Sequence, residues 1–403
     1  MTELEQAEIA MKSFADRTGV SGGVGDRRYL WTDAFAVTNF VGLARTTGKA
    51  EYTDLAVALV DRVHHTLGKH RPDSPRHGWL SGEEHDAGEQ HPTRGGLRIG
   101  KRLPERARGE PRDERLEWHR DGQYFHYLTK WMHALARVSA ATGSTAMIGW
   151  ARELCGVAHR AFTYVPDWGG HRRMYWKMSS DLSRPLVAAM GQHDPLDGYL
   201  TALELDAGKT PPTLARVSDD YRQMIDLTEL TTEDPLGLGG LLWDASRVGR
   251  LTALGALPDD TLLLSAILGA AEVGLQGFRA QWEHDAPARG RLPFRELGLS
   301  IGFHAAARLA KDVDAGLVQI ESRDRKILDR VVFASKIGRQ IEQFWLRPES
   351  RSAIGWVDHV DINEVMLATS LAPEGFLGIE PVVDAKTEPA AEAAHRRDDV
   401  AIP

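Results

Sequence analysis

The stretch that decides the fold is WTDAFAVTNFVGLARTTG, residues 31–48, an apolar run that opens with Asp33 and stops at Gly48. Residues 120–143, RDGQYFHYLTKWMHALARVSAATG, repeat this design, opening with Asp121 and stopping at Gly143. Apolar residues at helical spacing, followed by glycine, predict an α-helix that ends at the glycine. Because an amphipathic run follows each of them, the sequence predicts a series of helical hairpins.

The same alternation continues along the chain. Helices of the apolar, glycine-containing kind are predicted to begin near Asp33, Asp121, Leu186, Leu236, Phe294 and Asp361. Amphipathic partners are predicted over 2–17, 51–67, 146–162, 214–230, 260–282 and in a long run ending near Trp345. An open solenoid would need polar capping repeats at both ends. We therefore expect an all-α fold, an (α/α)6 toroid of six helical hairpins in which the N-terminal helix pairs with the last helix and closes the ring.

Composition limits the classes of protein to which the chain can belong. Its 403 residues are 42% hydrophobic and 26% charged, which is typical of a soluble globular protein. We expect residues 1–381 to form one barrel domain and residues 382–403, rich in Ala, Glu, Pro and Arg, to be a disordered tail. The formal charge of −8 argues against binding to nucleic acid or to an anionic membrane.

The location of the protein is predicted from its apolar runs and its cysteine content. The first 15 residues contain no apolar segment, and no run of about 18 apolar residues occurs, so we expect neither a signal peptide nor a membrane span. Cys155 is the single cysteine, which excludes an intrachain disulfide and fits a reducing compartment. We therefore expect a cytoplasmic protein.

Two long connections are predicted to carry the chemistry. Residues 70–117 and 164–185 are far longer than a median loop of about five residues, and each leads into the start of an apolar helix. With the helix starts, they bring many aromatic side chains to one mouth of the ring, where flat apolar faces would suit sugar rings: Trp31, Trp79, Trp118, Tyr124, Trp168, Tyr175, Trp176 and Trp356. The alternative is that these aromatic residues only anchor loops onto the barrel.

Carboxylates are predicted to gather at the same mouth. The apolar helices begin with Asp33, Asp121, Asp194 and Asp197, Asp234, Glu296, or Asp361. Each of these could simply cap its helix, so a functional interpretation needs clusters. In one cluster, Glu117 and Asp121 are four residues apart and would share a helix face beside Tyr124. In another, Asp194 suits the N-cap position, which leaves Asp197 for chemistry.

Cationic residues and histidines bear on substrate binding and on metal coordination. The stretch 172–184 combines Arg, Lys and aromatic residues, which would suit a carboxylated or phosphorylated sugar, and residues 77–94 suggest a lid. The sixteen histidines show no spacing typical of a zinc or iron site. No metal and no cofactor are therefore expected.

The motifs Trp31-Thr32-Asp33-Ala34-Phe35, Asp121-Gly122-Gln123-Tyr124 and His193-Asp194-Pro195-Leu196-Asp197-Gly198 resemble the six-hairpin glycosidase superfamily. This superfamily includes unsaturated glucuronyl hydrolases and, more distantly, the N-acylglucosamine epimerase and mannose isomerase group. In the glucuronyl hydrolases an inner-helix aspartate is the general acid and base, and the resemblance implies that Asp121 has this role. Epimerases and isomerases of the fold use histidines as proton carriers, a role that the resemblance implies for His193, His304 or His359.

The leading hypothesis is a glycoside hydrolase with Asp121 as general acid and Asp197, Glu117 or Asp33 as the second carboxylate. The sugar would be bound by Trp118, Tyr124, Trp176, Tyr175, His126 and Trp356, and an anionic substituent by Lys177, Arg184 or Arg94. The alternatives are a sugar epimerase or isomerase that depends on histidines such as His193, and a non-enzymatic helical-repeat binding protein. The expected partner is a small sugar substrate, and the protein could form a homo-oligomer.

Overall fold

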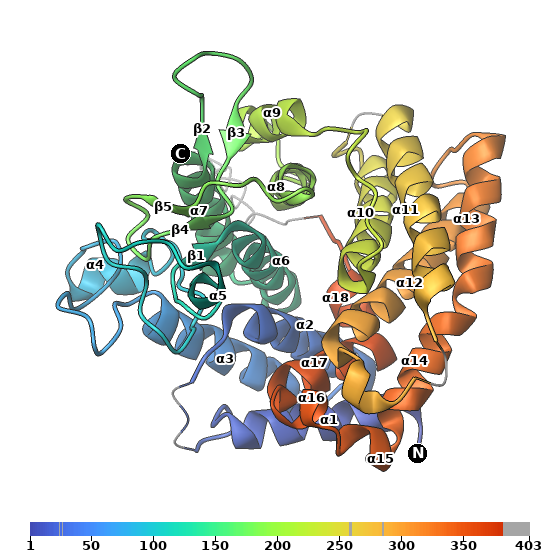
Figure 1. The fold of residues 1–403 in the computed structure, drawn as a ribbon, viewed down its shortest axis with the longest axis horizontal. Helices are drawn as coiled ribbons and strands as arrows, with labels where there is room; N and C mark the ends of the chain where they lie inside the picture. The colour runs from blue at the N-terminus through green and yellow to red at the C-terminus, as the bar shows by residue number, and fades with distance from the viewer. Residues whose placement is uncertain (24, 26, 258–259, 284–285, 382–403) are drawn as a thin grey trace, which may run out of the picture.

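The computed structural model describes residues 1–23, 25, 27–257, 260–283 and 286–381, so the predicted tail 382–403 lies outside the described residues. Six helices of the described chain form an inner ring (Figure 1). Each contacts the next in chain order, and the last contacts the first, so the ring is closed. The inner helices are α2 (Leu30–Thr47), α6 (Phe125–Thr142), α8 (Asp194–Leu205), α10 (Pro235–Ala253), α12 (Pro293–Asp314) and α17 (Val360–Leu371).

The outer layer packs against this ring. The N-terminal helix α1 lies against α17, the last inner helix, which confirms the predicted closure. The outer helices are α1 (Glu3–Arg17), α3 (Glu51–Leu67), α7 (Thr145–Phe162), α9 (Ala215–Met224), α11 (Thr261–Gln281), α13 (Ser322–Ala334) and α14 (Lys336–Leu346). The all-α (α/α)6 toroid expected from the sequence is therefore the observed fold.

Local sequence accounts for many of the helix ends. Thr2 forms a capping box with Glu5 at the start of α1. Helices α2 and α6 end at Gly48 and Gly143, as predicted, and both glycines have φ of 72°, in the left-handed region that favours glycine. These ends fix where each inner helix turns back toward its outer partner.

The structure differs from the prediction at two places. The sequence predicts an inner helix from Leu186, but Pro185–Val187 form a short strand and the helix begins at Asp194. A short apolar run cannot be assigned to helix or strand by periodicity alone, and Pro195 sets the start of the helix by occupying its first turn. The long run predicted to end near Trp345 is divided into α13 and α14 at Ser335.

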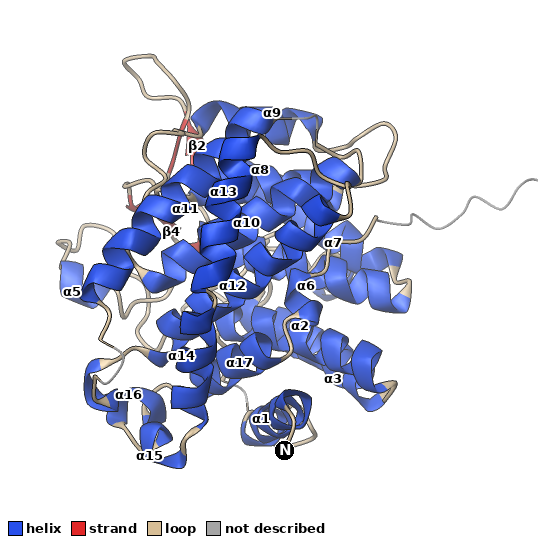
Figure 2. Ribbon diagram, turned by 90° about the vertical axis from the view of Figure 1, so that its right-hand side faces the viewer, coloured by secondary structure: helices blue, strands red, loops and turns tan. Residues whose placement is uncertain are grey.

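Short elements of the described chain lie in the connections between the long helices, and those between residues 85 and 187 build the layer of loops over one end of the ring. The strands β1, β4 and β5 form an antiparallel sheet, and β2 pairs with β3. Figure 2 shows that the strands lie within an otherwise helical molecule. The elements are α4 (His85–Gln90), α5 (Glu114–Glu117), β1 (Gln123–Tyr124), β2 (Thr163–Tyr164), β3 (Arg173–Met174), β4 (Lys177–Met178), β5 (Pro185–Val187), the 3-10 helix η1 (Ala288–Gly290), α15 (Pro348–Arg351), α16 (Ile354–Val357) and α18 (Glu374–Leu377).

The inner helices α10 and α12 approach each other closely because glycines line their contact. A Cβ atom on Gly239 of α10 would lie 2.1 Å from the backbone oxygen of Gly298 on α12. No side chain fits between the two backbones at this point, so glycine is required there. This contact helps to fix the width of the ring.

The short helix α18 closes the ring from the end opposite the loops. The ring of Phe376 stacks on Phe35 at 4.4 Å between centroids and packs against Trp243 at 4.6 Å. The backbone oxygen of Phe376 accepts a hydrogen bond from His133 Nε2 at 2.7 Å. Because Phe35, His133 and Trp243 belong to three different inner helices, Phe376 lies on the axis of the toroid. The central space is therefore a cup with an aromatic floor.

Among the described residues, one helix is long and apolar enough to cross a membrane by length and composition alone. It spans Leu262–Gln281, and half of it is buried inside the protein. Core helices of globular proteins also have these properties.

Candidate active site

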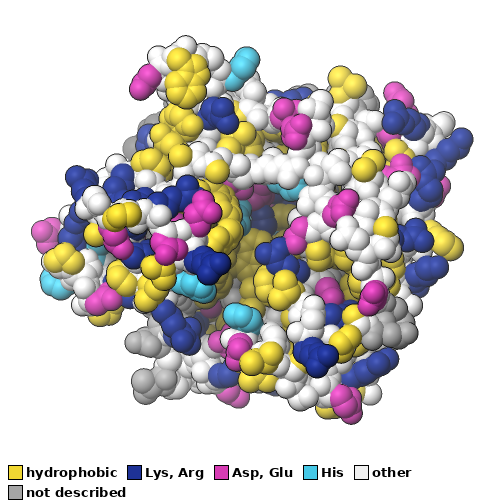
Figure 3. Space-filling model, in the orientation of Figure 1, with side chains coloured by type: hydrophobic (Ala, Val, Ile, Leu, Met, Phe, Trp, Pro, Cys, Tyr) yellow, Lys and Arg dark blue, Asp and Glu magenta, His cyan; other side chains and the backbone are white. Residues whose placement is uncertain are grey.

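The toroid is hollowed along its axis at the end covered by the loops. Figure 3 shows this depression at the centre of the view, between the loop layer on the left and helices α10 and α12 on the right. Apolar side chains and histidines are visible around it. We call this depression the central hollow. The long connections that lead into α6 and α8 lie at this end of the ring. The inner helices therefore begin around the hollow.

Five aromatic rings form a cluster beside the starts of α2 and α6, called the aromatic wall: Trp31, Tyr124, His126, Tyr127 and Trp176. Tyr124 lies 5.4 Å from both His126 and Trp176, centroid to centroid, and the His126 ring is stacked on it. Tyr127 packs between His126 and Trp31, at 4.8 and 5.3 Å. Trp31, Tyr124 and Trp176, which the sequence predicts at one mouth of the ring, thus belong to one cluster of rings.

His126, a member of the aromatic wall, lies close to Asp194 at the start of α8. Their closest atoms, His126 Nδ1 and Asp194 Oδ1, are 3.9 Å apart, and 28% of the His126 side chain is exposed. Within the described chain, His126 Nδ1 and Asp194 Oδ2 are buried without a hydrogen-bond partner. Gly191 makes room for the carboxylate, because a Cβ atom there would lie 2.3 Å from Asp194 Oδ2. Buried polar atoms without partners are unusual and indicate a site that a ligand or a proton completes.

Burial shifts the two pKa values in opposite directions. Burial, assisted by the negative charge of Asp197, raises the pKa of Asp194 to about 7. Burial, assisted by the Lys130 ammonium, lowers the pKa of His126 to about 3. At neutral pH the histidine is therefore neutral, and the carboxyl group of Asp194 retains its proton in much of the population.

Asp197 lies one turn further along α8 in a different environment. Its Oδ2 accepts a hydrogen bond from Lys130 Nζ at 2.7 Å, and its Oδ1 accepts one from Arg247 at 2.9 Å. The hydroxyl of Thr129 also donates to it. Burial alone would raise the pKa of Asp197, but Lys130 and Arg247 outweigh this effect and lower it. Asp197 is thus held ionised three residues from Asp194.

The floor beneath these carboxylates combines indole rings with cations. Lys130 Nζ lies 4.8 Å from the centre of the Trp243 ring, and the Arg247 guanidinium lies 4.4 Å from it. Asp244 pairs with Arg247 at 3.3 Å, and burial raises the pKa of this aspartate. Within the described residues, the Nε1 atoms of Trp31 and Trp243 are also buried without a partner. The walls of the hollow therefore hold unused donors as well as acceptors.

Asp121, the predicted general acid, is located elsewhere. Its side chain is fully buried, with Oδ2 bound by Arg98 at 2.6 Å and Oδ1 bound by the backbone N–H of Gly100 at 2.9 Å. Arg71 lies 3.5 Å away as a second cation. Asp121 therefore ties the loop 98–101 to the start of α6, and this geometry does not support a general-acid role.

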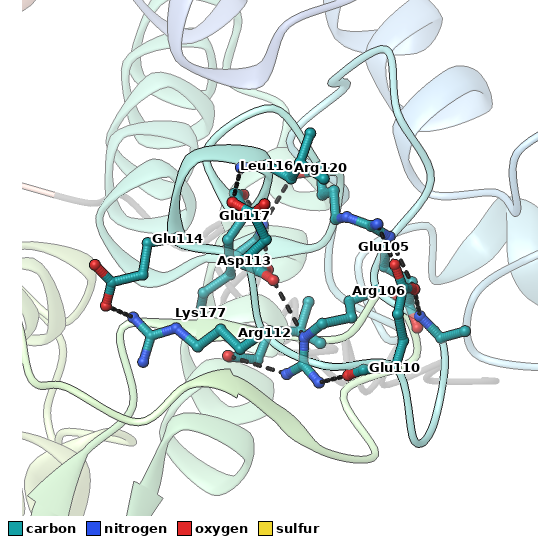
Figure 4. Close-up of polar contacts among 12 residues, drawn as sticks. Glu105, Arg106, Glu110, Arg112, Asp113, Glu114, Leu116, Glu117, Arg120 and Lys177 are labelled. Carbon is teal, nitrogen blue, oxygen red and sulfur yellow. Dashed lines mark hydrogen bonds and ion pairs between the residues drawn. The ribbon is translucent and has the colours of Figure 1, made fainter.

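Glu117 is also engaged, as Figure 4 shows. It pairs with Lys177 at 2.9 Å and with Arg106 at 3.3 Å. The helix α5 ends at Glu117, so Glu117 and Asp121 do not share the helix face that the sequence predicted. Lys177, predicted to hold an anionic substituent, is fully buried against Glu117.

Two further predicted catalytic residues stabilise local structure. Asp33 accepts a hydrogen bond from the backbone N–H of Tyr29 at 3.0 Å and pairs with Arg28 at 3.4 Å. Burial raises the pKa of Asp33 to about 6. The ring of His193 bonds the backbone oxygen of Leu230 at 2.8 Å. These contacts agree with the capping alternative for Asp33 and with a structural role for His193.

The remaining predicted residues fall into two groups. At the rim of the aromatic wall, Trp118 is 54% exposed and packs edge to face on Trp176. The others lie in contacts of their own: Tyr175 stacks on Tyr164, Arg94 pairs with Glu83 and Glu153, Arg184 pairs with Glu105, Trp356 stacks on Trp345, His304 bonds Glu342, and His359 is exposed before α17.

One residue of the rim escaped the sequence analysis. Lys101 Nζ lies 3.3 Å from the Tyr124 hydroxyl and 4.9 Å from the centre of its ring. Burial, assisted by the neighbouring Lys177, lowers the pKa of Lys101 to about 8. Its position in a loop without periodicity gave no signal. In the described residues, no group of three or more His, Cys, Asp or Glu side chains is arranged to hold a metal ion.

Known proteins resemble this chain in fold and hardly in sequence. No protein-family profile and no curated protein matches the chain. A GH76 α-mannanase of Bacteroides thetaiotaomicron superposes with a TM-score of 0.55 at 10% identity, over 93% of this chain and 96% of the mannanase. The protein shares the (α/α)6 toroid fold of this mannanase.

A second solved structure shares this toroid. It is an α-1,6-mannanase of Salegentibacter sp., an inactive variant with two consecutive aspartates replaced by alanine, in complex with α-1,6-mannotetrose. Its TM-score is 0.53 at 12% identity, over 93% of this chain and 99% of the mannanase. In the described part of the toroid, adjacent aspartates occur at Asp219 and Asp220 on the outer helix α9, and not in the hollow.

Proposed function

We propose that this protein is a carbohydrate-active enzyme, a glycoside hydrolase that works in the central hollow. The observation that carries the proposal is the pair Asp194 and Asp197 on one face of α8, whose environments shift their pKa values in opposite directions. A carboxyl group kept protonated beside a carboxylate kept ionised is the arrangement that glycosidic bond cleavage uses. The mannanases that share the fold lend support to a sugar substrate.

Asp194 is the proposed general acid. Its proton would be transferred to the glycosidic oxygen as the bond to the anomeric carbon breaks, and its pKa of about 7 keeps that proton available near neutrality. The negative charge of Asp197, held in place by Lys130 and Arg247, would stabilise the positive charge that develops on the sugar ring. This assignment retains Asp197 from the sequence hypothesis and replaces Asp121 with Asp194.

The aromatic wall is the proposed binding platform. The partly exposed rings of Trp176 and Trp118 offer apolar area for the C–H face of a sugar, with Tyr124 packed behind Trp176. The N–H groups of Trp31 and Trp243, which lack a partner among the described residues, could donate to its hydroxyls. α-Mannosides are the first substrates to test, because the solved relatives are α-mannanases. The single cysteine, Cys155, is buried, which is compatible with a cytoplasmic enzyme.

A sugar isomerase or epimerase is the second candidate, and one observation favours it. His126 is neutral, partly exposed and 3.9 Å from Asp194, so it could accept a proton from a sugar carbon or hydroxyl. In that case Asp194 would orient the imidazole and would not protonate a leaving group.

The test is a turnover screen with identification of products. Wild type is incubated with α-1,6-linked and α-1,2-linked mannobiose, neutral disaccharides, unsaturated glucuronides and free aldoses, and products are identified by proton NMR. Release of new reducing ends from a glycoside supports the hydrolase. Conversion of an aldose into its epimer or ketose, with glycosides left intact, would instead establish the isomerase, and no turnover of any sugar would contradict both.

A further inference from the structure

A second cavity lies in the loop layer, outside the central hollow. Its volume is about 390 Å³, and it is lined by residues from the segments 70–76, 98–108 and 180–184. No member of the aromatic wall lines it. A cavity of this volume accommodates a ligand of about the size of a monosaccharide derivative. We call it the arginine cavity.

Cations dominate the walls of the arginine cavity. Six arginines line it, against three acidic residues. Two carboxylates behind the wall are each shared by two cations, since Asp121 binds Arg98 and Arg71, and Glu117 binds Arg106 and Lys177 (Figure 4). Positive charge is therefore in excess around this cavity, although the whole chain has a formal charge of −8.

Backbone carbonyls hold part of this wall rigid before any ligand arrives. Arg71 donates to the backbone oxygens of Lys101 and Arg102 at 2.6 and 2.9 Å, and Arg98 donates to that of Lys69 at 2.8 Å. Arg71 and Arg98 are thus fixed before a ligand binds, so this part of the cavity keeps its shape and its positive charge on binding.

Other arginines of the cavity have guanidinium N–H groups that make no hydrogen bond to the described residues. Arg76 uses one guanidinium nitrogen, toward Asp181, and its side chain is 59% exposed. Arg184 uses one nitrogen, toward Glu105 and a backbone oxygen. Arg108 is exposed and has no polar partner among the residues that the structure describes. The planar fork of a guanidinium matches two oxygens of a phosphate or carboxylate group, so these donors suit an oxyanion.

We propose that the arginine cavity is a binding site for an anionic sugar derivative, in which a phosphate or carboxylate group is held by Arg76, Arg108 and Arg184. Lys101 links this site to the hollow, because its backbone oxygen accepts from Arg71 while its ammonium group lies 3.3 Å from the Tyr124 hydroxyl. The proposal concerns binding alone and does not depend on the reaction proposed for the hollow.

Isothermal titration calorimetry on the full-length protein tests the site. The ligands are glucose 6-phosphate, inorganic phosphate, glucuronate and glucose, all at one ionic strength set with KCl. Glucose 6-phosphate and inorganic phosphate report a phosphate site, and glucuronate reports a carboxylate site. We expect one of the two anion classes to bind and glucose to give no signal.

Two variants and a matched control locate the binding. Arg76→Ala and Arg108→Ala should each weaken binding of the anion about tenfold, which corresponds to about one lost charge-assisted contact. Arg102→Ala removes the same charge from the same loop, but Arg102 does not line the cavity, so its affinity should match wild type. Heat signals no larger than those of added KCl, or equal weakening in all three variants, would overturn the proposal.

Discussion

Replacement of Asp194 by Asn should raise the free energy of unfolding relative to wild type as the pH rises, and it should lower kcat. The pKa of this carboxyl group is raised from 3.8 to about 7 in the folded protein. At about 1.4 kcal/mol for each pKa unit, ionising the folded carboxyl group above pH 7 costs up to about 4 kcal/mol of folding free energy. Only 8% of the Asp194 side chain is exposed, so solvent screens little of this cost.

The sign follows from proton binding. Between about pH 4 and pH 7 the folded state binds more protons at Asp194 than the unfolded state does, so this residue lowers stability as the pH rises. His126 acts in the opposite direction between about pH 3 and 6.5, because its folded pKa is lowered and the unfolded state binds more protons. The two effects partly cancel in wild type, which is why the comparison with a variant is needed.

Asp194→Asn removes the titration of Asp194 and keeps that of His126. The free energy of unfolding of the variant, relative to wild type, should increase by about 2 to 4 kcal/mol between pH 4 and pH 8 and should level off above pH 7. Urea denaturation followed by circular dichroism at unit steps of pH measures this difference. A difference that stays constant over the whole range would refute the raised pKa.

Activity completes the test. If Asp194 donates a proton, the Asp194→Asn variant should lose about a hundredfold to ten-thousandfold in kcat, and kcat/KM of wild type should fall above about pH 7. The control is Asp324→Asn, a buried carboxylate on the outer helix α13 that accepts from Ser265 at 3.0 Å, and it should retain turnover. Full turnover in the Asp194→Asn variant would remove Asp194 from the mechanism.

Further changes test the wall, the loop and the ring. Trp176→Ala should raise KM about tenfold with a small change in kcat, because a stacking face is lost; an unchanged KM would exclude this platform. Asp121→Asn should lower the free energy of unfolding by about 3 kcal/mol, because Arg98 is left buried without its counter-ion. Lost turnover at unchanged stability would instead support Asp121 as the general acid. In urea denaturation, Gly239→Ala should destabilise the protein by about 2 kcal/mol through its clash with α12, whereas Gly240→Ala, with open space around it, should stabilise slightly.

The sequence predicted the ring because local rules determine it. Helix ends at Gly48 and Gly143, and the pairing of α1 with α17, follow from periodicity, left-handed glycine caps and the need to close the array. The helix expected at Leu186 was wrong because a short apolar run fits a buried strand equally well. Helix positions and the closure of the ring could therefore be predicted from periodicity and from the number of helices, whereas the pairing of the short strands could not.

The site could be predicted only in part. That aromatic residues and carboxylates meet at one mouth follows from where the inner helices begin, and His126 and Asp197 were identified in this way. The sequence assigned Asp194 to the N-cap of α8, but His193 has that position and Asp194 makes no capping hydrogen bond. The ion pair of Asp121 could not be predicted, because its partner Arg98 lies 23 residues earlier, in a loop whose packing has no periodic signal.

The carboxylates at the inner-helix starts differ in whether they form an ion pair with an arginine or lysine. The toroid brings seven of them to one end of the ring, and an unpaired negative charge is costly for those that are buried. Six have an arginine or lysine within ion-pair distance in the described structure: Asp33, Asp121, Asp197, Asp234, Glu296 and Asp361. Asp194 forms no ion pair with an arginine or lysine in the described part of the chain, and the neutral His126 lies 3.9 Å from it. A buried carboxyl group without a paired cation lowers its energy by keeping its proton, and among these seven groups Asp194 is the one whose pKa is raised to about 7. The residue that sequence rules treat as an ordinary cap is thus the one whose environment suits catalysis.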